Sequence, residues 1–127
     1  MTESSESLGA RLARLDRVRT VVLTHHGRKS GKPYDVRIWF TVDGDRVNLQ
    51  TMNVERQWVR NVLVHPKVSL RIGDELFEGD ATPVTDPGAM KRVVELMKKK
   101  YPIARPYLWF KKQPAGAFHV ALSARPA

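Results

Sequence analysis

The stretch from Tyr34 to Val42 alternates strictly between apolar and polar side chains, which is the pattern of a strand with one buried face. The dipeptide Asp43-Gly44 follows, and it suits the positive backbone angles of a tight turn. Apolar alternation then returns at Val47 and Leu49. The pattern therefore predicts an antiparallel hairpin. The apolar positions of its first strand are Val36, Ile38, Phe40 and Val42.

Shorter runs of the same kind predict further strands, at 20–24, 47–51, 68–72, 75–84 and 117–123. Helical spacing predicts a helix over 6–17 with Ser4 or Ser5 near its cap. A second helix is expected from an Asn53 cap to Pro66, and a third from Asp86-Pro87 to Tyr101. The order gives about six strands without βαβ alternation. It predicts residues 1–127 as one α+β domain, mainly β: an antiparallel barrel with flanking helices.

The chain contains no cysteine, which excludes disulfides, thiolate zinc sites, iron–sulfur clusters and a cysteine nucleophile. Its N-terminus is polar and acidic, and no apolar run approaches the ~20 residues that span a bilayer. We therefore expect a soluble cytoplasmic protein without an integral membrane segment.

The net charge is +9, from 22 basic and 13 acidic residues, and it predicts an anionic partner. Nucleic acid, anionic lipid and a phosphorylated cofactor all qualify. The stretch 98–112 is rich in lysine and contains no acid, so we expect it to border water or an anion. Its interleaved aromatic residues suggest a nucleic-acid binder as one alternative. No recognition helix or RNA-binding signature accompanies them, so a nucleic-acid partner is not expected.

The loop Gly27-Arg28-Lys29-Ser30-Gly31-Lys32 lies between two predicted strands and contains three cations, one hydroxyl and two glycines. Glycines let backbone amides turn toward a ligand, so these are the components of a phosphate cradle. The loop lacks the Walker spacing and the helix that follows a Walker loop directly. A solvated basic hairpin loop is the alternative interpretation.

An ordered series of short motifs surrounds this loop. Val22-Leu23-Thr24 precedes it, a strand ending in Trp39-Phe40 and a Val-Asp-Gly-Asp-Arg turn follow, and Gln57 to Leu63, His65 to Val68 and Gly73 continue the series. Over roughly residues 18–85 the chain resembles the deazaflavin (F420)-dependent nitroreductase and quinone reductase family, within the pyridoxamine 5'-phosphate oxidase-like FMN-binding superfamily. The resemblance implies a six-stranded split β-barrel. It also implies a homodimer that holds its cofactor in a groove near the subunit interface.

The resemblance also implies roles for individual residues. The loop residues Arg28, Lys29, Ser30, Gly31 and Lys32 would bind the cofactor phosphate. The strand residues Arg37, Ile38 and Trp39 would back the ring. The other side of the ring would be closed by Thr51, Met52, Asn53, Gln57, Trp58 and Asn61. Trp58 could instead belong to the core, because an aromatic residue where a helix meets a sheet usually does.

The function implied by the resemblance is that of an oxidoreductase. It would transfer a hydride from reduced coenzyme F420 to a quinone, enone or nitroaromatic acceptor. FMN is the alternative cofactor, and a carrier of a flavin, haem product or lipid without turnover is the alternative function. Scattered histidines, His25-His26 among them, do not predict a metal site, and spacing alone assigns no catalytic residue. The aromatic segment 102–114 could form a lid, and Tyr101, Tyr107, Trp109 and Phe110 could line an acceptor pocket or pack a dimer.

Overall fold

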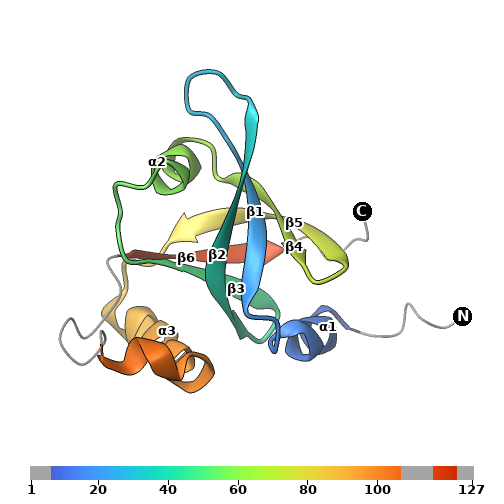
Figure 1. Ribbon diagram of the computed structural model, residues 1–127, viewed down its shortest axis with the longest axis vertical. Coiled ribbons are helices and arrows are strands. Elements are labelled where there is room, and N and C mark those ends of the chain that lie inside the picture. Colours follow the sequence, from blue (N-terminus) through green and yellow to red (C-terminus); the bar gives the residue numbers. More distant parts are fainter. Residues whose placement is uncertain (1–6, 107–115, 123–127) are drawn as a thin grey trace, which may run out of the picture.

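The computed structural model describes residues 7–106 and 116–122, in which six strands close into a barrel (Figure 1). The order around the barrel is β1-β2-β3-β6-β5-β4, and every neighbouring pair is antiparallel. The strands are β1 (Thr20–His26), β2 (Pro33–Asp43), β3 (Arg46–Thr51), β4 (Lys67–Ile72), β5 (Glu75–Pro83) and β6 (Gly116–Leu122). The helices are α1 (Leu8–Leu15), α2 (Gln57–Val64) and α3 (Pro87–Lys100), with a 3-10 turn η2 (Pro102–Ala104). The predicted six-stranded antiparallel α+β barrel is confirmed.

Two predicted hairpins build most of the barrel wall. In the first, Phe40 pairs with Leu49 and Asp43 with Arg46, so the turn lies where the sequence places it. In the second, Ile72 pairs with Glu75. The last strand, β6, closes the barrel by pairing with β3 on one side and β5 on the other. Pro83 ends β5, where its missing N–H breaks no ladder within the strand.

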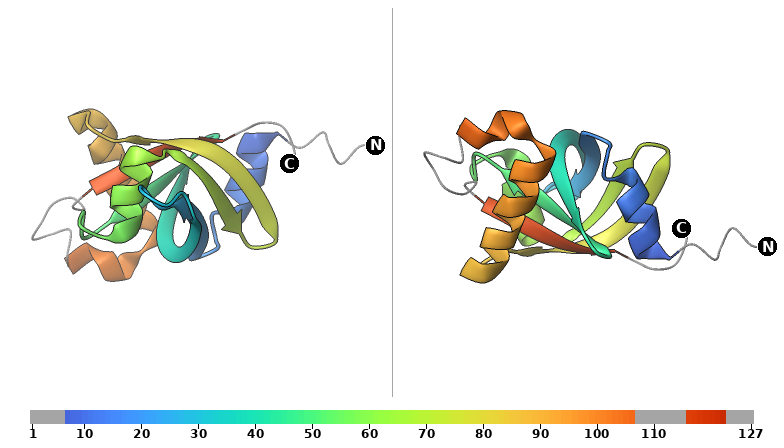
Figure 2. Two further views of the ribbon diagram at one scale, coloured as in Figure 1. Left: turned by 90° about the horizontal axis from the view of Figure 1, so that it is seen from above. Right: turned by 90° about the horizontal axis from the view of Figure 1, so that it is seen from below.

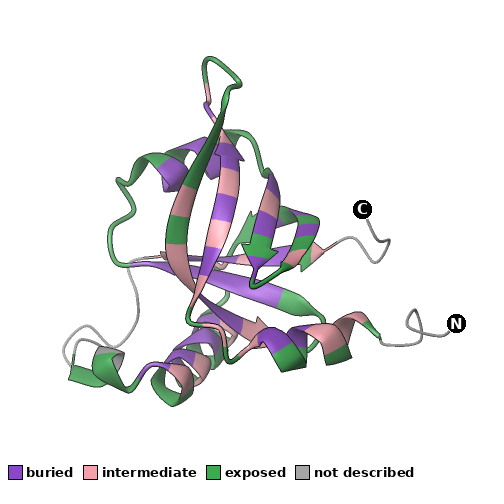
Figure 3. Ribbon diagram, turned by 45° about the vertical axis from the view of Figure 1, so that its right-hand side comes forward, coloured by how far each residue is buried: buried purple, intermediate pink, exposed green. Residues whose placement is uncertain are grey.

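Apolar side chains from all six strands fill the barrel interior. Phe40, Leu49 and Val120 are fully buried there. Along β1, buried and half-buried residues alternate, as the banding in Figure 3 shows. Leu12 and Leu15 of α1 join the same core cluster. Each large apolar side chain removed from water contributes about 1.5–3 kcal/mol, so this interior supplies the main driving force for folding.

A second, smaller apolar cluster lies between α3 and the barrel. It contains Met90, Val93, Val94 and Met97 of α3 with Ala117 of β6. At the end of the helix, the Tyr101 ring stacks on Trp39 at 4.3 Å between centroids. The Tyr101 hydroxyl accepts from the Phe40 amide at 3.1 Å and lies 2.6 Å from the Arg19 carbonyl oxygen. Burial raises the pKa of Tyr101 to about 12, and Tyr101 ties α3 to the barrel.

Two helix starts differ from their predicted positions. Helix α1 begins after Ser7, whose Oγ accepts from the Ala10 amide at 3.1 Å; Ser4 and Ser5 lie outside the described residues. Helix α2 begins at Gln57 and not after Asn53. The Asn53 side chain accepts instead from the Glu55 amide at 2.9 Å, which forms a local turn that competes with helix capping. The predicted helix start at Asp86-Pro87 is confirmed, and the Asp86 carboxylate caps α3 by accepting from the Ala89 amide at 2.8 Å.

The basic stretch that begins at Lys98 does not point wholly to water. Lys100 is only 11% exposed at its side chain, and its Nζ lies 3.1 Å from Asp16 Oδ1 and 3.4 Å from the Phe40 ring centroid. Burial lowers the pKa of Lys100 in spite of the Asp16 partner. Lys100 thus borders an anion, the Asp16 carboxylate of the same chain, and not open water. A cation–π contact and an ion pair compensate for its partial burial.

The helices lie outside the barrel wall (Figures 1 and 2). Helix α2 and the loop between β1 and β2 share one end of the molecule, whereas α1 and α3 lie toward the other (Figure 1). None of the helices in the described ranges is long and apolar enough to cross a membrane. The proposed lid falls largely outside the described residues, as do Tyr107, Trp109 and Phe110.

Candidate functional site

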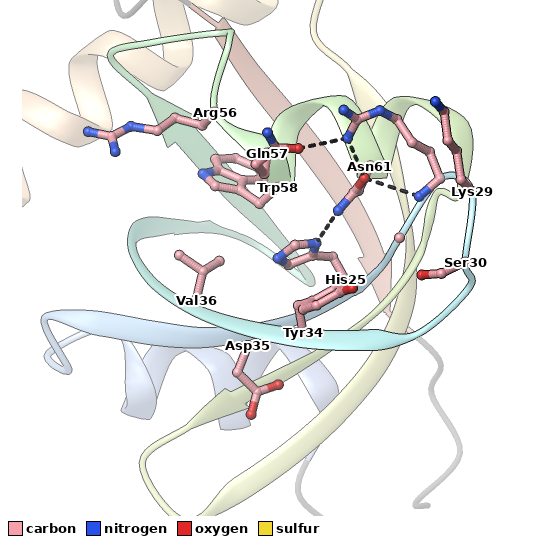
Figure 4. A pocket seen from close by; sticks show the side chains of 12 residues that line it. His25, Lys29, Ser30, Tyr34, Asp35, Val36, Arg56, Gln57, Trp58 and Asn61 are labelled. Atoms are coloured by element: carbon pink, nitrogen blue, oxygen red, sulfur yellow. Dashed lines mark hydrogen bonds between the residues drawn. The ribbon is translucent and has the colours of Figure 1, made fainter.

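A groove runs along the start of β2, beneath the N-terminal half of α2 (Figure 4). Its first part, the loop end, measures about 700 Å³. Its second part, the strand end, measures about 370 Å³ and shares Val36, Arg56 and Trp58 with the first. The loop end is further lined by His25, Gly27, Arg28, Lys29, Ser30, Tyr34, Asp35, Gln57 and Asn61. The strand end is further lined by Arg37, Ile38, Trp39, Gln50, Thr51, Met52 and Asn53.

The basic loop forms a compact turn at the mouth of the groove. The Gly27 amide donates to the Lys32 carbonyl at 2.9 Å, and the Gly31 amide donates back to the Gly27 carbonyl at 2.8 Å. Gly31 has φ +73°, which favours glycine. The hydrogen bonds of the described residues leave the amides of Lys29 and Ser30 without an acceptor. Two exposed N–H donors and two cations therefore lie together, as an anion site requires.

Gly27 is closely packed within this turn. A Cβ at this position would lie 2.7 Å from Ser30 Oγ and 3.2 Å from the Tyr34 ring. Ser30 Oγ also accepts from the Lys32 amide at 3.2 Å. A side chain at position 27 would therefore push apart the two ends of the turn.

Asn61 of α2 connects the loop to β1 (Figure 4). Its Oδ1 accepts from the Arg28 amide at 3.1 Å and from Arg28 Nη1 at 2.7 Å. Its Nδ2 lies 3.0 Å from His25 Nδ1. The Arg28 contacts fix the amide orientation, so His25 Nδ1 must accept and the ring carries its proton on Nε2. Burial lowers the pKa of His25, which agrees with a neutral ring.

Arg28 is held at one nitrogen and leaves the rest of its guanidinium available. Nη1 donates to Gln57 Oε1 at 2.9 Å as well as to Asn61. Both acceptors are neutral amides, and no carboxylate of the described residues forms an ion pair with Arg28. The full positive charge therefore remains to attract an anion, on a side chain whose position is already fixed.

Most residues that the sequence singles out meet along this groove. Arg28, Lys29, Ser30, Gln57, Trp58 and Asn61 line the loop end. Arg37, Ile38, Trp39, Thr51, Met52 and Asn53 line the strand end. Gly31 and Lys32 line neither end. Gly31 borders a separate hollow with His26 and His65 instead.

Trp58 is both a core residue and part of the groove wall. It is 5% exposed, and its ring centroid lies 5.7 Å from that of Phe118 in the barrel. It nevertheless lines both ends of the groove. Most of the indole thus stabilises the core, and the remainder gives the groove an aromatic surface.

Apart from His25, six lining residues of the groove are not among the predicted site residues: Gly27, Tyr34, Asp35, Val36, Arg56 and Gln50. His25 enters the sequence analysis only as one of the scattered histidines that do not predict a metal site. The alternation of β1 carries a signal for it, because His25 follows the buried positions Val21 and Leu23 on the same face. A histidine in an inward register needs a polar partner, and Asn61 supplies it. In the described ranges, no three His, Asp or Glu side chains gather as metal ligands.

Comparison with known proteins gives one family and a common fold. A family model described as F420H(2)-dependent quinone reductase matches residues 1–108. A solved F420-H2 dependent reductase (FDR-A) is 22% identical, with a TM-score of 0.66 over 80% of this chain and 92% of that one. A putative pyridoxamine 5'-phosphate oxidase from Listeria innocua is 19% identical, with a TM-score of 0.69 over 91% and 93%.

A structure described as a domain-swapped dimer is 22% identical, with a TM-score of 0.65 over 80% of this chain and 78% of that one. These three likenesses show a shared fold. No curated protein sequence gives a significant match.

Proposed function

The chain belongs to the F420H(2)-dependent quinone reductase family, and from that premise we propose that it is a reductase holding coenzyme F420 in the groove beneath α2. The observation that carries the proposal is the state of Arg28. Two neutral side-chain oxygens, on Gln57 and Asn61, fix its guanidinium in place without neutralising its charge. Such a group binds a phosphate with little loss of side-chain freedom.

The loop end fits the phosphate of the coenzyme. Lys29 and Ser30 add exposed amides and side chains next to Arg28, and the tight Gly27 turn holds them there. Arg60 is exposed on α2, one residue before Asn61. This positive surface would also attract the acidic tail of the coenzyme, because opposite charges raise the local ligand concentration.

The strand end fits a flat ring. Ile38 and Met52 supply apolar surface, and Trp58 supplies an aromatic wall between the two ends. Reduced F420 supplies a hydride when it is bound. The residues of this chain would bind and orient the coenzyme and exclude water from it, which is the protein's part in most cofactor chemistry. Quinones, enones and nitroaromatics are the acceptors that we propose.

Titration of the purified protein with F420 and, separately, with FMN tests the cofactor. We expect F420 to bind with a dissociation constant well below 1 mM and more tightly than FMN, on the order of the affinities of specific ligands. Failure of both to bind would contradict the proposal. Tighter binding of FMN would identify FMN as the cofactor in place of F420. Reduced F420 should then be oxidised in the presence of a quinone or nitroaromatic. Binding without such oxidation across a broad panel would instead support a carrier.

Assembly and location belong to the same proposal. A homodimer agrees with the fold shared with a protein described as a domain-swapped dimer. Light scattering of the purified protein would test it. Cytoplasmic location stays a prediction.

A further inference from the structure

Four polar side chains form a hydrogen-bonded chain across β2, β3 and β6. Thr41 pairs with Asn48 across β2 and β3, and Asn48 pairs with His119 across β3 and β6. His119 Nδ1 lies 2.6 Å from Asn48 Oδ1, and Asn48 Nδ2 donates to Thr41 Oγ1 at 3.2 Å. Gln50 lies two residues beyond Asn48 on the same strand and ends this chain.

The orientation of the Gln50 amide is fixed by its surroundings. Nε2 donates to Thr41 Oγ1 at 2.7 Å and to the backbone carbonyl of Asn48 at 3.3 Å. A carbonyl oxygen only accepts hydrogen bonds, so the flipped amide would place two oxygens against each other. Gln50 Oε1 therefore faces away from the polar chain.

Gln50 Oε1 has no donor among the described residues. The residue is 4% exposed and lines the strand end of the groove. A buried acceptor without a partner is rare in folded proteins because it has lost its water without replacing it. The atom thus indicates a hydrogen-bond donor that the described residues do not supply.

Neighbouring polar groups do not satisfy this acceptor. The Thr51 hydroxyl donates to the Asn53 carbonyl at 2.8 Å and accepts from the Asn53 amide at 3.1 Å. Arg37 Nη1 donates to Thr20 Oγ1 at 3.2 Å, on the neighbouring strand. Arg56 extends away from Asn61 in Figure 4. Gln50 Oε1 is therefore the buried acceptor of the strand end that the described residues leave without a donor.

We propose that Gln50 is a specificity-determining residue whose Oε1 accepts a hydrogen bond from the imide N–H of the ring bound at the strand end. The inference rests on the proposed function, because that function places a ring there. Deazaflavin rings carry this N–H between two carbonyl groups at the end remote from the sugar alcohol. An apolar ring, or one alkylated at that nitrogen, leaves the acceptor unpaired and binds more weakly.

Binding affinity tests the inference independently of turnover. Fluorescence titration compares F420 with its derivative methylated at the imide nitrogen. The wild-type protein should bind the methylated compound about 10- to 100-fold more weakly. Gln50→Met removes the acceptor, and Gln50→Ala also leaves room for the added methyl group. Both variants should discriminate between the two compounds by less than about threefold.

Gln57→Met is the matched control, because the same substitution then falls at the loop end. It should weaken the binding of both compounds by the same factor, so that the ratio of their affinities stays at the wild-type value. Equal binding of the two compounds by the wild-type protein would overturn the inference even if the Gln50 variants failed to fold. An unchanged ratio in folded Gln50 variants would also overturn it, since Gln50 would then be only structural. Failure of F420 itself to bind would contradict the proposed function instead.

Discussion

Asn61 Nδ2 lies 3.0 Å from His25 Nδ1, where it donates to the ring nitrogen of a histidine whose pKa is lowered by burial. The same amide accepts from Arg28 through its oxygen. The side chain therefore links a residue of the barrel wall to the cation that we place on the coenzyme phosphate. Protonation of His25 would turn Nδ1 into a donor and force the amide to rotate or the contact to break.

Stability should fall as the pH falls below about 6.5. Burial lowers the pKa of His25; Asp35 raises it by a smaller amount, and His26 lowers it. The unfolded chain therefore binds a proton before the folded one does, so this stability is fully present above the unfolded pKa and is lost as the pH falls through the folded one. Thermal unfolding between pH 5 and 8 measures it.

Burial lowers the pKa of His119 as well, so a single variant does not remove the whole effect. The melting temperature of His25→Gln should fall less steeply with decreasing pH than that of the wild type, and the double variant with His119→Gln less steeply still. Identical slopes for the wild type and His25→Gln would contradict the neutral state assigned to His25.

Asn61→Asp should weaken F420 binding by about tenfold or more. The carboxylate would still accept from Arg28, but it would neutralise the charge that the phosphate requires. It would also favour protonated His25 and raise its folded pKa toward or above the unfolded value, so the loss of stability on acidification should become smaller or reverse. Isothermal titration and pH-dependent melting measure the two effects. An affinity unchanged from the wild type would show that Arg28 does not bind the phosphate.

Gly27→Ala should lower both stability and affinity, because its Cβ would meet Ser30 Oγ at 2.7 Å. We expect a loss of about 1 kcal/mol in unfolding free energy, and a larger relative loss in coenzyme binding. Gly31→Ala is the control with open space around it but φ +73°, so it should lower stability through backbone strain alone. Urea denaturation and F420 titration of both variants separate packing from strain. Equal loss of affinity in the two would contradict the close-packing account.

Tyr101→Phe should cost about 1–3 kcal/mol of unfolding free energy. The variant keeps the stack on Trp39 but leaves the Arg19 carbonyl and the Phe40 amide without the hydroxyl. Tyr101 lies outside the described groove lining, so F420 affinity should stay within about twofold of wild type. A stable variant would show that these backbone groups find other partners.

Much of the fold follows from local patterns. The alternation of β2 and the turn at Asp43 predict the first hairpin, and Asp86-Pro87 predicts the start of α3. The start of α2 does not follow from the sequence. The Asn53 side chain can either cap a helix or stabilise a local turn, and in the structure it forms the turn with the Glu55 amide. Lys100 is equally uninformative in isolation, since Asp16 and Phe40 reach it only after folding.

The candidate site was predicted at its loop end better than at its strand end. The charges and glycines of six adjacent residues indicate the loop directly in the sequence. Gln50 gives no such signal, because its burial on both sides depends on β6, which closes against β3 from more than half the chain away. The Asn61 contacts join residues 36 and 33 positions apart, and no periodicity predicts such a pairing.

The central claim is that fixed, uncompensated Arg28 anchors the phosphate of F420. The most direct measurement is a titration of wild type, Arg28→Met and Arg71→Met with F420 and with its phosphate-free riboside. Arg71 is exposed on β4 and outside the groove lining, so it controls for the loss of one charge. Arg28→Met should weaken F420 binding at least tenfold and leave riboside binding unchanged, whereas Arg71→Met should alter neither. Equal losses for both ligands, or none for either, would contradict the account.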